Sequence, residues 1–170
     1  MKPLCNANIE VLNQLKELVQ LSADIYVKKP NSKHAGIGEH VRHVLDHYRA
    51  LKIGYENRQI DYNLRTRNCV EESQPFLALT NIDELIFWLS DLDYDESELS
   101  VVSEISLRQR QNQIMQSNTE REMLYLINHS IHHMAYASLL ASVNGIQLPS
   151  YIGLAPGTAS YQRQQNQESA

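Results

Sequence analysis

Apolar residues recur every three or four positions in four stretches of the chain, which is the spacing that places them on one face of an α-helix. The first stretch opens with Ile9, Leu12 and Leu15, and polar residues separate the apolar ones. After the last stretch, Gly145 suits the left-handed residue that often ends a helix. The pattern predicts helices at about residues 9–27, 37–54, 75–92 and 117–143.

The segment between the third and fourth predicted helices has a different pattern. Residues 99–115 alternate partly between apolar and polar, with apolar side chains at Val101, Ile105 and Leu107, and this favours one or two short strands. Ser117-Asn118-Thr119-Glu120 then has the form of a capping box, which opens a helix. The sequence therefore predicts an all-α fold of four helices, with a short extended or β-hairpin excursion between helices three and four.

Length and composition limit the classes of protein. A chain of 170 residues can bury one core, so one domain is expected over residues 1–160, followed by a polar, disordered tail at residues 161–170. The net charge of -5 offers no broad basic surface, so no nucleic-acid partner is expected. No apolar run approaches the roughly 18 residues of a membrane span, so no membrane partner is expected. Two cysteines without CxxC spacing argue against a disulfide scaffold and favour a reducing cytoplasm.

Histidines are clustered along the chain: six of the seven lie within residues 39–47 and 128–133. His129 and His133 are four residues apart on one helical face, with Cβ atoms about 5 to 6 Å apart, where two imidazoles can share a metal. At about 100° per residue they point the same way as the apolar Leu126, Ala137 and Leu140. Two inward imidazoles without partners would be costly, and a metal is one way of satisfying them.

The second helix offers a third ligand. His40, His43 and His47 lie within about 60° of one another around its axis, and the residues alone leave the choice among them open. A three-nitrogen set leaves coordination positions for water or substrate, and it suits Zn or Ni first, with Fe, Mn or Co as alternatives. The simpler interpretation is that these histidines, like an isolated histidine on a helix, are hydrogen-bonded in the core or exposed.

Four further residues are candidates for chemistry near this set. Glu122, two turns before His129 on the same face, is a candidate general base, although it also suits the start of its helix. Arg65 and Arg67 either bind an acidic substrate or cofactor or order their loop. Asp46 either orients an imidazole by accepting its distal N–H or is a solvated helix carboxylate.

In their order along the chain these motifs resemble the DinB/YfiT-like superfamily. His43-Val44-Leu45-Asp46 is similar to that family's His-Leu-x-Asp signature, and residues 129–133 resemble its HxxxH pair. The resemblance implies an up-and-down four-helix bundle with one divalent metal, and it selects His43 to join His129 and His133. A subgroup with Gly-x-His-x-Arg-His, Asp-Tyr-Asn-x-Arg-x-Arg and a later Arg-Glu pair extends the likeness to further residues, namely Arg65, Arg67, Arg121 and Glu122.

Members of that family with known activity include thiol S-transferases that use bacillithiol or glutathione-like cofactors, and a mycothiol-dependent isomerase. The resemblance therefore implies a metal-dependent, thiol-dependent S-transferase with a small-molecule substrate and a low-molecular-weight thiol as second cofactor. A metal-dependent hydrolase, in which the metal activates water, is one alternative. A non-catalytic metal-binding or stress-related bundle is another, and a homodimer is plausible for such bundles.

Overall fold

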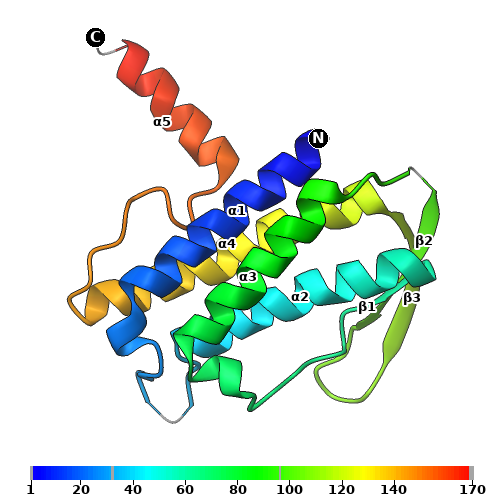
Figure 1. Ribbon diagram of the computed structural model, residues 1–170, viewed down its shortest axis with the longest axis horizontal. Coiled ribbons are helices and arrows are strands. Elements are labelled where there is room, and N and C mark those ends of the chain that lie inside the picture. The colour runs from blue at the N-terminus through cyan, green and yellow to red at the C-terminus, as the bar shows by residue number, and fades with distance from the viewer. Residues whose placement is uncertain (1, 32, 96, 169–170) are drawn as a thin grey trace.

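The structure, a computed structural model, describes residues 2–31, 33–95 and 97–168. It is mostly helical, with one small sheet at one end (Figure 1). Within these ranges, no helix is both long enough and apolar enough to cross a membrane. The helices are α1 (Pro3–Leu21), α2 (Ile37–Asn57), α3 (Pro75–Asp91), α4 (Thr119–Val143) and α5 (Pro156–Glu168). Two short 3-10 helices (Ala23–Ile25, Val70–Glu72) and strands β1 (Gln59–Asp61), β2 (Glu98–Glu104) and β3 (Asn112–Asn118) complete the elements.

Two helix starts differ from the prediction. Helix α1 begins at Pro3 instead of Ile9, because proline suits the first turn, where its missing N–H is not needed. At the start of α4 the capping box does not form. Instead the Asn118 side chain accepts a hydrogen bond from the backbone N–H of Arg121 at 2.9 Å. The hydroxyl of Ser117 belongs to β3 and is used elsewhere.

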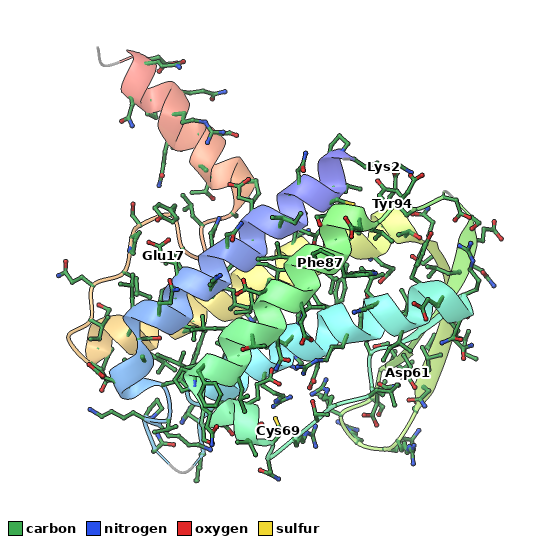
Figure 2. All side chains as sticks on the ribbon, viewed as in Figure 1. Lys2, Glu17, Asp61, Cys69, Phe87 and Tyr94 are labelled. Carbon is green, nitrogen blue, oxygen red and sulfur yellow. The ribbon has the colours of Figure 1, made fainter. Side chains whose placement is uncertain are left out.

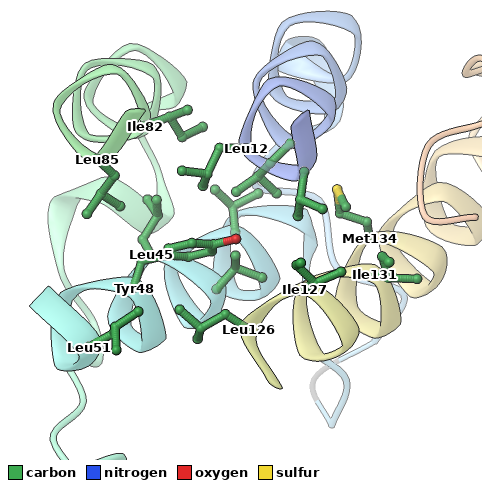
Figure 3. Packing of buried hydrophobic residues seen from close by; sticks show 14 of the residues in the cluster. Leu12, Leu45, Tyr48, Leu51, Ile82, Leu85, Leu126, Ile127, Ile131 and Met134 are labelled. Atoms are coloured by element: carbon green, nitrogen blue, oxygen red, sulfur yellow. The ribbon is translucent and has the colours of Figure 1, made fainter. Parts of the chain in front are cut away.

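The core lies between α1, α2, α3 and α4, in which α1 packs against α3 and α4, and α2 packs against α4 and α3 (Figure 3). Leu12, Leu45, Ile82 and Leu126 each contribute a buried side chain to it. Burying one such side chain stabilises the fold by about 1.5 to 3 kcal/mol. The Tyr48 hydroxyl is also buried there, and it donates to the Asn8 side-chain oxygen at 2.9 Å. The core therefore fixes α2 beside α4, the two helices that carry the histidine clusters.

The sheet confirms the predicted hairpin and adds a strand that the sequence analysis missed. Strands β2 and β3 pair antiparallel, and β1 pairs parallel with β2, giving the order β1-β2-β3. Ile60 of β1 packs against α2 at Gly54, where an added Cβ would lie 2.5 Å from the Ile60 side chain. Glycine at this position therefore lets the sheet approach the end of α2.

The C-terminal segment differs from the expectation up to residue 168, and residues 169–170 of the predicted tail lie outside the described residues. In place of a disordered tail, Pro156–Glu168 forms α5, which projects away from the other helices in Figure 1. None of its residues is buried. Proline at the first position and four glutamines, which favour helices more than most polar residues do, are compatible with a helix at this position.

Candidate metal centre

His43 of α2 meets His129 and His133 of α4 where the two helices face each other. One ring nitrogen of each lies within 4.8 Å of those of the other two. The Nε2 atoms of His43 and His129 are 3.1 Å apart. Two nitrogens bound to one zinc at about 2.0 to 2.1 Å lie about 3.3 Å apart in tetrahedral geometry. The structure therefore brings together the three predicted histidines at a spacing that suits a single metal ion.

The inward direction predicted for the pair on α4 is confirmed. Leu126 and Ala137, on the same face, are buried, and the rings of His129 and His133 are 4.6 Å apart between centroids. His132, one residue away, is exposed instead. Because side chains four residues apart lie one turn from each other on a helix, this local geometry was readable from the sequence.

The three imidazoles are in the protonation state that binds a metal. Burial, with a smaller contribution from neighbouring imidazoles, lowers the pKa of His43 to about 2 and those of His129 and His133 to about 3. At neutral pH the rings are therefore uncharged, and each has one nitrogen lone pair available. Three neutral nitrogens from two rigid helices form a donor set that fits a divalent cation.

Two more histidines of α2 support this set. The Nδ1 atom of His40 lies 2.9 Å from Nδ1 of His133, which leaves Nε2 of His133 for a metal. Nδ1 of His47 donates to the backbone oxygen of His43 at 2.9 Å, and its ring stacks on that of His129, 4.1 Å away between centroids. All three histidines of α2 therefore face α4, as their angular spacing predicted.

A hollow of about 320 Å³ opens beside His129. His47, Tyr62 and Tyr125 form its inner wall, and residues 103–107 of the hairpin form another side. Arg65, one of the two predicted binding residues, lies at this hollow with an exposed side chain, whereas Arg67 does not line it. The histidine set therefore adjoins a space that a small molecule can enter.

Glu122 is placed one layer away from the histidines. It is buried, its Oε2 accepts from the Tyr62 hydroxyl at 2.9 Å, and its Oε1 accepts from the Ser117 hydroxyl at 2.5 Å. The ring of Tyr62 stacks in turn on His47. Glu122 does not line the hollow beside His129. Its role as a general base therefore stays a prediction.

Neither interpretation of Asp46 from the sequence is right. Its carboxylate is buried, and it accepts from Arg42 Nη1 and from the backbone N–H of Thr66, each at 3.1 Å. The Thr66 hydroxyl donates to the same group. Because these donors occupy it, Asp46 holds the loop between Arg65 and Arg67 instead of orienting an imidazole.

The sequence analysis missed the two tyrosines of the inner wall. Tyr125 lies four residues before His129, so its position on the same helical face was a usable signal. Tyr62 gave no such signal, because it reaches His47 only through the pairing of β1 with β2.

Comparisons with known proteins do not identify a family. No family model matches the chain, and no solved structure matches it. The chain is similar to a curated protein of Rhizopus delemar named FK506-binding protein 5, with 28% identity over 109 residues. The match covers 62% of this chain but only 28% of that protein, so the chain spans less than a third of its relative. A name given to that whole protein does not transfer to this chain.

Proposed function

We propose that the chain is an up-and-down four-helix bundle of the DinB/YfiT-like kind that binds one divalent metal through His43, His129 and His133. One observation carries this proposal: three uncharged imidazoles from two helices converge with their ligating nitrogens within 4.8 Å. The order and spacing of the motifs that resemble that superfamily support the same assignment.

We further propose that the protein is a metal-dependent enzyme that transfers a low-molecular-weight thiol to a small-molecule substrate. Three protein ligands leave positions open for a reactant, and the hollow beside His129 provides space for one. A bound divalent cation would lower the pKa of a thiol or of water held there. In this proposal His47, Tyr62 and Tyr125 limit access of water on the inner side of the hollow, and Arg65 faces the incoming molecule.

Metal content tests the first proposal. Purified, untagged protein is exposed to Zn, Ni, Fe and Mn and analysed for bound metal, beside His43→Ala, His129→Ala and His133→Ala. His132→Ala is the matched control, because its exposed side chain lies next to the set on the same helix. About one metal per chain is expected in the parent and the control, and much less in the other variants. The proposed site is wrong if those variants retain the metal, or if the parent binds none of the four metals.

Turnover tests the second proposal. The metal-loaded parent is mixed with a panel of thiols and electrophiles, with His129→Ala as the inactive comparison. Metal-dependent loss of thiol together with formation of the thioether product supports a transferase. Stoichiometric metal without turnover of any thiol or hydrolysable ester leaves a metal-binding protein that is not an enzyme.

A further inference from the structure

The hollow beside His129 continues into a second, more polar hollow. This outer hollow has a volume of about 620 Å³ and lies between the loop after β1 and the hairpin. Asp61, labelled in Figure 2, belongs to its lining. Asn63, Arg65 and Glu104 line both hollows. A molecule bound across them would therefore contact Arg65 at one end and reach the histidines at the other.

Three arginines of the outer hollow have no acidic partner. Among the residues that the structure describes, Arg65, Arg67 and Arg110 form no ion pair and no side-chain hydrogen bond. By contrast, Arg42 and Arg49 are held by carboxylates at 2.9 and 2.8 Å. A guanidinium without an internal partner keeps its five N–H donors for a ligand, and its planar fork matches the two oxygens of a carboxylate.

The backbone around Arg65 and Arg67 is held in place before any ligand arrives. Asp46 binds the backbone N–H of Thr66 at 3.1 Å, so the residue between Arg65 and Arg67 is tied to α2. On the other side, the backbone N–H of Glu104 donates to the Asn63 side-chain oxygen at 2.8 Å, which joins the loop to the hairpin. Binding to such a site loses little backbone freedom, which favours affinity.

The charge of the outer hollow sets the kind of anion. Three guanidiniums face two carboxylates, those of Asp61 and Glu104, which leaves one net positive charge. One charge matches a carboxylate better than a dianionic phosphate. Arg65 also lies near the histidines, because it lines the hollow beside His129 together with His47 and His129.

We propose that Arg65, flanked by Arg67 and Arg110, binds the carboxylate of a small molecule whose reactive end reaches His43, His129 and His133. This inference rests on the proposed function and narrows its substrates or thiol cofactors to carboxylate-bearing molecules. Arg65 is assigned the direct contact because it alone of the three arginines lines both hollows.

The test compares a thiol that carries a carboxylate with its uncharged methyl ester. Mercaptopropionate and its methyl ester are titrated into cobalt-loaded protein, and thiolate binding is followed by the absorption of the cobalt ion. The acid is expected to bind about tenfold more tightly than the ester, the size of one charge-assisted hydrogen bond. In Arg65→Gln the two should bind equally, with the ester unchanged. Arg108→Gln is the matched control, an exposed hairpin arginine outside both hollows, and should behave as the parent.

Two outcomes overturn the inference: equal binding of acid and ester by the parent, or an equal loss of both in Arg65→Gln. A second arm separates this failure from failure of the metal site. In metal-free protein, propionate should shift the Arg65 Nε–H signal in nitrogen-edited NMR spectra, assigned by its loss in Arg65→Gln, and propionamide should not. No uptake of cobalt with the propionate shift intact would reject the metal and keep the anion site. Absence of the shift would reject the anion site.

Discussion

Helix α2 contributes to two buried polar clusters of opposite character. The first, the charged cluster, consists of Arg42, Asp46, Arg49, Glu71 and Glu72. In it unlike charges meet: Arg42 Nε lies 2.9 Å from a Glu72 oxygen, and Arg49 Nη2 lies 2.8 Å from a Glu71 oxygen. Among the described residues one oxygen of Glu71, Oε1, has no partner, but the other accepts two hydrogen bonds. Every charged group of this cluster therefore has at least one partner of opposite charge.

The second, the histidine cluster, brings like groups together. Nitrogen faces nitrogen at 3.1 Å between His43 and His129 and at 2.9 Å between His40 and His133. The buried Nε2 of His40 has no hydrogen-bond partner within the described part of the chain. Burial lowers the pKa of these rings, so charge does not hold them together. A cluster in which like groups face one another is a stronger indication of a ligand than a cluster whose groups are paired with opposite charges.

The largest expected effect comes from opening the charged cluster. Asp46→Ala removes the acceptor of three hydrogen bonds, from Arg42 Nη1 and from the backbone N–H and hydroxyl of Thr66, while Arg42 keeps Glu72. The loss is expected to lower the free energy of unfolding by about 3 to 5 kcal/mol. Urea unfolding in the presence of a chelator measures it. Asp83→Ala removes an exposed ion pair, in which Asp83 Oδ1 lies 2.6 Å from Lys16 Nζ. This variant should lower the free energy of unfolding by at most about 1 kcal/mol. Equal losses in the two variants would contradict the structural role of the charged cluster.

Metal removal should affect the histidine cluster alone. Zinc at a thousandfold excess over its dissociation constant is expected to raise the free energy of unfolding by about 4 kcal/mol, because the folded state binds it and the unfolded state does not. Chelation should reverse this gain, and His133→Ala should show none of it. The measurement is urea unfolding with and without zinc. A gain of the same size in His133→Ala would place the metal elsewhere.

Acid should weaken the metal-free protein through the same cluster. The folded pKa values of about 2 to 3 lie below the ordinary 6.5. At pH values between the folded and the unfolded pKa, the unfolded chain binds protons on these histidines and the folded chain does not. The stabilising contribution is therefore complete above about pH 6.5 and is lost as the pH falls below it. Partial exposure keeps the slope of each histidine under about 1.4 kcal/mol per pH unit.

Thermal melting of metal-free protein from about pH 7.5 to about pH 5 checks this direction. His43→Leu removes one of the titrating rings, so its melting temperature should fall less steeply with acid than that of the parent. A slope that is identical in the two proteins would show that acid acts on other groups.

Features that depend on neighbouring residues in the chain were predictable. Pro75 marks the observed start of α3, and Gly145, with a φ of 82°, follows the end of α4 as expected. The spacing of His129 and His133 fixed their common direction, because four residues make about one helical turn. The alternating segment became a hairpin between α3 and α4. In each case a local rule of backbone geometry was enough.

Features that join distant parts of the chain could not be predicted from the sequence. Strand β1 has three residues and exists only because it pairs with β2, about forty residues further on. The hydrogen bond between Asp46 and Thr66 depends on how the loop after β1 packs against α2, and the spacing of residues in the sequence does not predict it. The same holds for His40, whose angular position matched those of His43 and His47 but whose contact with His133 required the packed helices.

The smallest change in stability is expected for His40, and it tests whether the histidine cluster serves a metal or the fold. His40→Leu removes a buried nitrogen, Nε2, that has no partner among the described residues, but it also removes the Nδ1 contact with His133. Because these two effects oppose each other, the free energy of unfolding of the metal-free protein should change by less than about 0.5 kcal/mol. The same variant should weaken zinc binding by about 10- to 100-fold, since His133 loses the contact at Nδ1 that orients its ring. His40→Gln, whose amide oxygen can accept from Nδ1 of His133, should restore most of that affinity. Competition with a chelating dye measures zinc affinity, and urea unfolding measures stability. A large loss of stability in metal-free His40→Leu, with zinc affinity unchanged, would contradict this prediction. It would show that His40 stabilises the fold, as the residues of the charged cluster do, and does not support the metal site.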